Sequence, residues 1–172
     1  MPLITDQIIS LSPLTDIDLT YELISWLNDI DIMRHSRQRF KTHTLETSRV
    51  YLKSFNDNES LYVKIIEVGS NQMIGTMTAF IDATVQTADL GILIGNRSEW
   101  GKGYGLRAWN LMINYVFNNY DVVTITGGCE INNTKMIAIL KKAGMFEYKI
   151  ETLRDAYSEY SVIRYKINKD KN

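Results

Sequence analysis

The sequence has few of the residues that disulfide-bonded, metal-binding or membrane-spanning proteins need. Its 172 residues include one cysteine and two histidines, so neither a disulfide framework nor a cysteine–histidine metal site is expected. No stretch approaches the roughly 18 consecutive apolar residues of a membrane helix. A signal peptide is not indicated either, because Asp6 interrupts the N-terminus and no apolar core follows it. We therefore expect a cytoplasmic protein with no metal and no membrane partner.

The sequence also has a small net charge and only two prolines. The 19 basic residues are balanced by 20 acidic ones, so the chain lacks the broad positive potential with which many proteins attract nucleic acids, and we expect no nucleic-acid partner. Both prolines, Pro2 and Pro13, lie near the N-terminus. With 45% hydrophobic residues, residues 1–172 are expected to form one domain around one core, with 168–172 as a flexible tail.

Hydrophobic periodicity predicts an α/β (α+β) fold of interspersed strands and helices. Strands are expected at residues 8–14, 61–68, 73–81, 87–94, 121–130, 145–152 and 160–167, and helices at 16–28, 44–55, 105–118 and 134–143. In the first helix, Asp16 is the expected N-cap, and one apolar face would comprise Ile17, Tyr21, Ile24 and Leu27.

The most informative feature is a glycine-rich loop between a predicted strand and a predicted helix. Gly101, Gly103 and Gly105 alternate in this loop, and because glycine has no Cβ, the backbone N–H groups can point inward together. Such a nest at a helix N-terminus binds anions, and Lys102 adds a positive charge. The loop therefore predicts a site for a phosphate-bearing ligand.

Two common phosphate-binding motifs fit this loop poorly. A P-loop has a serine or threonine after its lysine, but Lys102 is followed by Gly103. A dinucleotide-binding fingerprint is met literally by Gly103, Gly105 and Ala108. However, its glycines should directly follow the strand, whereas residues 96–100 intervene here. Neither motif explains the loop.

The segment Trp-Gly-Lys-Gly-Tyr-Gly at residues 100–105 instead resembles the pyrophosphate loop of the GNAT N-acetyltransferase superfamily. It is most similar to the branch that contains the ribosomal-protein alanine acetyltransferases and the amino-sugar acetyltransferases. Asn133, followed by Lys-Ala-Gly-Met-Phe at 142–146, is similar to a second family motif, and residues 21–29 resemble the first helix of this branch. The resemblance covers residues 8–167. It implies the GNAT fold, a mixed and mostly antiparallel central sheet flanked by helices.

The resemblance also implies how acetyl-CoA would bind. The glycine-rich loop would hold the pyrophosphate of coenzyme A, and the backbone of residues 92–94 would run beside the pantetheine arm. Asn133 would contact that arm or shape the gap between two central strands. The expected coenzyme site comprises Ile92, Leu93, Ile94, Trp100, Gly101, Lys102, Gly103, Tyr104, Gly105 and Asn133.

Two carboxylates are candidates for helping to deprotonate an acceptor amine. Asp89 lies on the predicted strand before the loop, where this branch often carries a carboxylate, and Glu130 ends the next predicted strand. For Asp89, a solvated or hydrogen-bonded strand residue is the alternative interpretation. Met136 and Leu140 depart from the family, because they stand where many members have a serine and a tyrosine that protonates the thiolate.

A basic run lies in the segment that borders the acceptor site in this family. It includes Arg34, Arg37, Arg39 and His43, with no acidic residue between them. Such a run would suit an acceptor that carries phosphate, and a solvated basic surface is the alternative. Residues 39–44, Arg-Phe-x-x-His-Thr, resemble acetyltransferases of amino-sugar pathways.

The resemblance and the residues together predict an acetyl-CoA-dependent N-acetyltransferase that transfers the acetyl group directly to a primary amine. The preferred acceptor is a nucleotide-linked amino sugar or another small amine. The alternatives are acetylation of a protein N-terminus, as in the ribosomal-protein branch, and a non-catalytic module that binds acyl-CoA. We expect a monomer or a homodimer.

Overall fold

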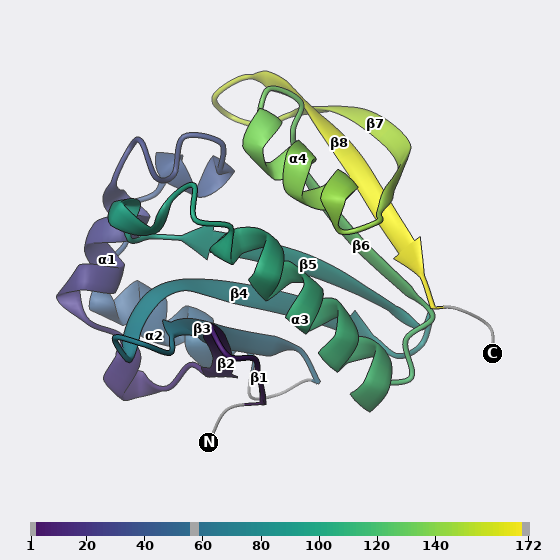
Figure 1. Cartoon of the computed structure of the whole chain (residues 1–172). Helices are drawn as coiled ribbons and strands as arrows, with labels where there is room; N and C mark the ends of the chain where they lie inside the picture. The colour runs from purple at the N-terminus through teal and green to yellow at the C-terminus, as the bar shows by residue number, and fades with distance from the viewer. Residues whose placement is uncertain (1–2, 56–58, 170–172) are drawn as a thin grey trace.

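One eight-stranded sheet forms the centre of the computed structural model, which describes residues 3–55 and 59–169 (Figure 1). The strands are β1 (Ile4–Thr5), β2 (Ile9–Pro13), β3 (Leu61–Glu67), β4 (Gln72–Asp82), β5 (Thr87–Ile94), β6 (Thr124–Glu130), β7 (Phe146–Arg154) and β8 (Glu159–Asn168). The helices are α1 (Tyr21–Asn28), α2 (Leu45–Lys53), α3 (Tyr104–Asn119) and α4 (Thr134–Lys142), with short 3-10 helices at Asp16–Asp18, Arg37–Phe40 and Arg97–Glu99.

The strand order in the sheet is β1-β2-β3-β4-β5-β6-β8-β7. Every neighbouring pair is antiparallel except β5 and β6, which are parallel. This arrangement confirms the predicted mixed and mostly antiparallel sheet flanked by helices. None of the helices in the described part of the chain has the length and apolar character needed to cross a membrane.

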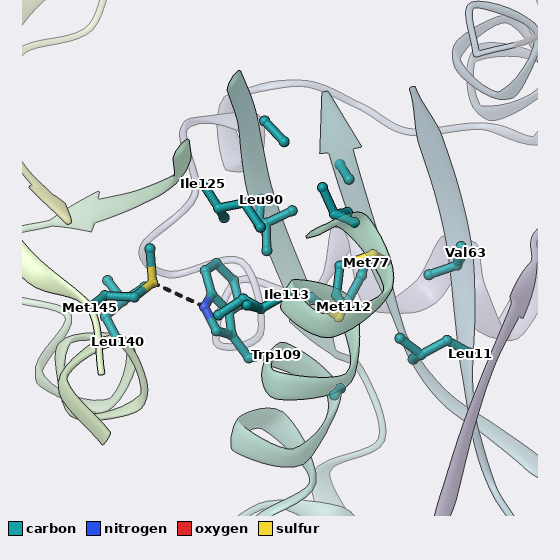
Figure 2. Packing of buried hydrophobic residues seen from close by; sticks show 14 of the residues in the cluster. Leu11, Val63, Met77, Leu90, Trp109, Met112, Ile113, Ile125, Leu140 and Met145 are labelled. Atoms are coloured by element: carbon teal, nitrogen blue, oxygen red, sulfur yellow. Dashed lines mark hydrogen bonds between the residues drawn. The ribbon is translucent and has the colours of Figure 1, made fainter. Parts of the chain in front are cut away.

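Helices cover both faces of the sheet. The main core lies between α3 and the side chains of one sheet face, and Trp109 at its centre has no exposed surface (Figure 2). Trp109 donates its Nε1–H to Met145 Sδ at 3.2 Å. Gly127 makes room for the indole, because a Cβ there would lie 2.7 Å from Trp109 Cζ2. On the opposite face, α1 and α2 pack around a smaller cluster that includes Leu23 and Trp26.

The parallel strands β5 and β6 pair along only part of their length. Residues 87–90 of β5 pair with 124–127 of β6. Beyond this point, residues 91–94 pair only with β4, and residues 128–130 pair only with β8. The two strands therefore diverge (Figure 1), and the edge of β5 that faces β6 has no strand partner over 91–94 within the described residues.

The first predicted helix is two separate elements, so its predicted start at Asp16 is wrong. The 3-10 helix at Asp16–Asp18 is capped at its N-terminus by the Asp18 carboxylate. This carboxylate accepts hydrogen bonds from Thr15 N–H and Oγ1–H at 2.8 and 2.7 Å. α1 then begins separately, with Thr20 as its N-cap, and the Thr20 side chain accepts a hydrogen bond from Leu23 N–H at 3.2 Å.

The predicted apolar face of this helix is wrong for the same reason. The break between the two elements changes the helical phase, so the buried side chains of α1 are Leu23 and Trp26. Ile17 and Tyr21 are 86% and 83% exposed. The other two predicted residues of this face are half-buried.

Two boundaries near the C-terminus also differ from the prediction. β6 begins at Thr124, three residues later than expected, because pairing with β5 starts only at that residue. The predicted flexible tail is partly ordered, since Asn168 is the last residue of β8 and Lys169 N–H donates to Val123 O at 2.9 Å. Residues 170–172 lie outside the described residues.

Gly95, directly after β5, is where α1 contacts the end of the central strand. A Cβ at Gly95 would lie 2.0 Å from Trp26 Cδ2, an overlap that requires the indole or the backbone to move. We expect Gly95→Ala to lower the free energy of unfolding by about 1–3 kcal/mol, measured by urea denaturation. Gly69→Ala is the control, because its Cβ would meet only the flexible Glu67 carboxylate. Equal, small losses in both variants would contradict a tight Trp26–Gly95 contact.

Candidate active site

The glycine-rich loop between β5 and α3 has the backbone conformation of an anion-binding nest. Gly101 and Gly103 have φ values of +81° and +85°, which residues with side chains rarely adopt. A Cβ at either position would meet no atom within 4 Å, so the space in front of the loop is open. Gly103 is the N-cap of α3, and the first turn has neither a side-chain cap nor an acidic residue. These N–H groups and the helix dipole are therefore available to an anion.

The other predicted loop residues hold the loop in place. Gly105 lies in the first turn of α3, where a Cβ would be 3.0 Å from Ile139 Cδ1 of α4, so this glycine allows the two helices to approach. Trp100 donates its Nε1–H to Ile94 O at 2.8 Å. Tyr104 packs against the main core. Two of the three predicted nest glycines thus have the left-handed conformation, and the third serves helix packing.

Two lysines lie near the loop. Lys102 Nζ is 3.0 Å from the Glu99 carboxylate, and this hydrogen bond raises the pKa of Lys102. Lys135, in the first turn of α4, lies with its Nζ 5.0 Å from the centre of the Trp100 ring. No carboxylate of the described residues pairs with Lys135. The motif did not identify Lys135. Of the two lysines, it is the one without a carboxylate partner among the described residues, so its charge is available to a ligand.

The gap between β5 and β6 connects the loop to the middle of the sheet. The unpaired edge of β5 at residues 91–94 borders this gap, and the side chains of Ile92 and Ile94 pack against the main core. Asn133, just after β6, is the N-cap of α4 and accepts a hydrogen bond from Met136 N–H at 3.1 Å. Backbone groups without a strand partner along β5 fit an extended pantetheine arm, and the open nest fits a pyrophosphate.

A cleft of about 490 Å³ lies on the other face of β5. We call it the β4–β5 cleft, and it is lined by Leu27, Met33, Ser36, Gln38, Lys41, Thr42, His43, Thr47, Ser48, Tyr51, Tyr62, Thr76, Met77, Thr78, Gly91, Ile92 and Leu93. Residues 91–93 therefore contribute both to this cleft and to the unpaired edge of β5.

Hydroxyl groups dominate the chemistry of the β4–β5 cleft. Ser48 is only 7% exposed, and its buried Oγ has no hydrogen-bond partner. Burial raises the pKa of Tyr62 to about 12, although a hydrogen bond with Thr76 partly opposes this shift. Lys41 is the one lysine or arginine, and no aspartate or glutamate of the described residues lines the cleft. Sequence reasoning missed these hydroxyls because they are scattered over α2, β3 and β4.

Asp89 lies on the same face of β5 but outside the β4–β5 cleft. Its Oδ1 accepts a hydrogen bond from Thr126 Oγ1 at 2.6 Å and lies 3.4 Å from Arg164 Nη1. Arg164 also binds Glu151, so the carboxylate belongs to a network on β6, β7 and β8. The structure therefore pairs this predicted catalytic residue with a cation instead of leaving it free.

The predicted basic run is largely neutralised by acids, two of which come from distant parts of the chain. Arg39 Nη1 lies 3.0 Å from Glu130 Oε1, and Arg37 Nε donates to Asp155 Oδ2 at 2.8 Å. Arg34 pairs with Asp31 at 3.0 Å. None of these three arginines lines the β4–β5 cleft, and of the predicted acceptor-site residues only His43 does. Glu130, the second predicted catalytic residue, is likewise held by arginines.

Taken together, the open nest at α3, the unpaired edge of β5 and the adjoining cleft have the shape and chemistry that suit a phosphate-bearing thioester beside a second ligand. The sequence pattern of the acetyltransferase (GNAT) domain matches residues 9–146, and the chain belongs to this family. Its members use acetyl-CoA, which confirms the expected enzyme class and acetyl donor. A comparison with curated protein sequences gives no match.

Solved structures have the same fold over nearly the whole chain. The ribosomal L7/L12 α-N-protein acetyltransferase RimL with coenzyme A has a TM-score of 0.85 at 11% identity, covering 98% of each chain. Spermidine N-acetyltransferase from Vibrio cholerae with CoA and spermine has a TM-score of 0.82 at 19% identity, covering 95% of this chain and 96% of that one.

The microcin C7 self-immunity acetyltransferase MccE, in complex with acetyl-CoA and AMP, has a TM-score of 0.82 at 19% identity, covering 95% of this chain and 93% of that one. At such identities the likeness shows the fold alone. RimL and the Vibrio enzyme are named for different acceptors, and none of the three is named as an amino-sugar acetyltransferase. The fold therefore leaves the acceptor open.

Gly103→Glu tests the nest. We expect it to weaken binding of coenzyme A by about 100-fold or more, because a side chain and a negative charge would occupy the phosphate position. Isothermal titration with coenzyme A measures this effect. Gly103→Asn is the matched control, since asparagine is neutral and tolerates the left-handed φ of +85°. Unchanged affinity in Gly103→Glu, in a variant that melts normally, would exclude the loop as the pyrophosphate site.

The Arg37–Asp155 pair predicts a pH-dependent contribution to stability. Hydrogen bonds from Arg37 hold the pKa of Asp155 at about 2, below its ordinary value of 3.8. A lowered folded-state pKa stabilises above the unfolded value, and this contribution is lost as pH falls from 3.8 toward about 2. We expect Arg37→Ala to lower the melting temperature at neutral pH, with the difference from wild type shrinking below about pH 4.

Asp155→Asn is the matched variant and should remove the same pH dependence. Arg37 also stacks on the Phe40 and Tyr160 rings, at 4.4 and 4.2 Å from their centres. A melting-temperature difference that stays constant across the acid range would assign the effect of Arg37→Ala to this stacking alone.

Proposed function

We propose that this acetyltransferase moves the acetyl group of acetyl-CoA directly to the primary amine of a small molecule, with a nucleotide-linked amino sugar as the preferred acceptor. The composition of the β4–β5 cleft carries this proposal. Hydroxyl groups line it, Tyr51 adds an aromatic ring, Lys41 supplies a cation, and no carboxylate of the described residues reaches it. Hydroxyls can hydrogen-bond a sugar, and a lysine complements a phosphate.

The buried Ser48 hydroxyl adds a specific requirement. Its Oγ lines the cleft without a hydrogen-bond partner, and a buried polar group without a partner is costly. A ligand hydroxyl or carbonyl in the cleft would satisfy it. This favours an acceptor rich in hydrogen-bonding groups over an apolar amine.

The state of the single cysteine supports direct transfer. Burial raises the pKa of the Cys129 thiol to about 11, so near neutral pH the thiol is protonated and a weak nucleophile. Cys129 also lies outside the β4–β5 cleft. An acetyl-cysteine intermediate is therefore unsupported, and the acceptor amine would attack the thioester carbon in a ternary complex.

A polyamine matches this cleft less well. Its several positive charges would need carboxylates, and the predicted acids are already engaged, Asp89 with Arg164 and Glu130 with Arg39. Lys41 in the cleft would add repulsion. The distribution of charge therefore favours a neutral or anionic amine.

Thiol release from acetyl-CoA across a panel of amines tests the proposal. We expect turnover with nucleotide-linked amino sugars, slower turnover with the free amino sugars, and none with spermidine. Lys41→Ala should raise KM for the phosphate-bearing acceptor about tenfold and leave KM for acetyl-CoA unchanged. Lys53→Ala, on α2 and outside the cleft, is the matched control.

Other outcomes of the panel would redirect the assignment. Turnover confined to peptides with free N-termini would favour a protein acceptor, as in the ribosomal-protein branch. Turnover with spermidine would contradict the argument from charge. Binding of acetyl-CoA with no thiol release for any amine would indicate a non-catalytic acyl-CoA-binding module, and Leu140, fully buried where many family members have a tyrosine, would agree with that result.

A further inference from the structure

We propose that His43 is the general base that removes a proton from the acceptor amine. This assignment rests on the proposed transfer to a primary amine and names the group that makes the amine nucleophilic. His43 directly precedes the N-cap of α2 and lines the β4–β5 cleft together with Gly91 and Leu93. An alkyl amine is largely protonated near neutral pH, so its lone pair becomes available only after a base has taken that proton.

The backbone of His43 is fixed by one side chain. Asn28, the last residue of α1, accepts a hydrogen bond from His43 N–H at Oδ1 (2.9 Å) and donates one from Nδ2 to His43 O (2.8 Å). The Asn28 amide also donates to Ile24 O within α1 at 3.0 Å. These bonds attach residue 43 to the end of α1 independently of the imidazole.

The roles of the two ring nitrogens follow from one hydrogen bond. His43 Nε2 lies 3.1 Å from the backbone oxygen of Gln38. A carbonyl oxygen can only accept, so Nε2 carries the hydrogen and Nδ1 of the neutral ring keeps its lone pair. The same carbonyl stays bonded to the ring after Nδ1 is protonated and stabilises the resulting cation. Nδ1 is therefore the nitrogen that can take a proton.

The other titratable groups of the cleft are unsuited to this role. Burial raises the pKa of Tyr62 to about 12 and also raises that of Tyr51, so both phenols remain protonated near neutral pH. Lys41 is already a cation. Asp89 and Glu130 lie outside the cleft and are held by arginine side chains. His43 is the remaining base among the described residues that line the cleft.

The ionisable groups that line the cleft with His43 come from three elements. The segment before α2 contributes Lys41, α2 contributes Tyr51 and β3 contributes Tyr62, whereas the lining residues of α1, β4 and β5 are not ionisable. No aspartate or glutamate lies among these described residues, so the ring has no carboxylate partner in the cleft. A neutral ring is the form that can act as base.

The proposed step balances without any further reactant. The ammonium group of the acceptor gives one proton to His43 Nδ1, and the neutral nitrogen attacks the carbonyl carbon of the thioester. The new C–N bond forms, the C–S bond breaks, and the thiolate leaves with the bonding pair. The second proton on nitrogen goes to the thiolate, and His43 releases its proton to water. The products are an amide, the thiol of coenzyme A and one proton.

His43→Ala tests the assignment, because the Asn28 bonds go to the backbone of residue 43 and are unaffected by the substitution. We expect kcat/KM for the acceptor to fall about 100-fold near neutral pH, with the affinity for acetyl-CoA unchanged in a binding titration. The rise of kcat/KM between about pH 5 and 8, which reports the free imidazole, should disappear. Imidazole added to the variant should restore part of the rate.

His35→Ala is the matched control. His35 lies outside the β4–β5 cleft, with Nδ1 3.8 Å from Glu130, and its removal should leave the pH profile unchanged. Asp89→Asn is the competing variant. If Asp89→Asn abolishes the acid limb of the profile, or if His43→Ala loses rate without a changed profile and without restoration by imidazole, the assignment is overturned.

The wild-type measurement separates this assignment from the proposed function. An enzyme that binds acetyl-CoA but turns over no amine would remove the proposed function and the base assignment together. Turnover by the wild type, followed by a normal rate and pH profile in His43→Ala, would leave the proposed function intact and overturn only the role of His43.

Discussion

The site depends on the point at which β5 and β6 stop pairing. The two strands are hydrogen-bonded over residues 87–90 and 124–127 and then diverge. Backbone N–H and C=O groups require partners, so the unpaired edge of β5 is a place where an extended ligand can take the position of a strand. The same stretch of β5 borders the β4–β5 cleft on its other face. One short segment of β5 therefore borders both the gap between β5 and β6 and the β4–β5 cleft.

The ion pairs near this segment hold in place a piece of chain that lines the cleft. Arg37 and Arg39 fasten the 3-10 helix before α2 to Asp155 in the β7–β8 turn and to Glu130 at the end of β6. Their structural role is to hold Gln38, which lies between them in the sequence and lines the cleft. The consequence is a cleft whose interior is nearly uncharged, although its border carries many ions.

The sequence predicted the features that depend on local pattern. The glycine spacing after an apolar strand indicated the nest, and Gly101 and Gly103 have the expected left-handed conformation. It did not predict which charges would meet, because the partners of Arg37 and Arg39 are far away in the chain. The phase of α1 was also missed, since a separate 3-10 helix with its own capping box at Thr15 precedes α1, which begins anew with Thr20 as its N-cap. Such tertiary and capping effects leave little trace in hydrophobic periodicity.

The pairs that fasten the cleft wall join residues that are far apart in the chain. Arg37 and Asp155 are 118 residues apart, and Arg39 and Glu130 are 91 apart. The bonds that shape the glycine-rich loop join neighbours, such as Trp100 and Ile94. Because synthesis runs from the N-terminus and distant contacts form late, a chain still on the ribosome can shape its nest before the hairpin that closes the acceptor side has emerged.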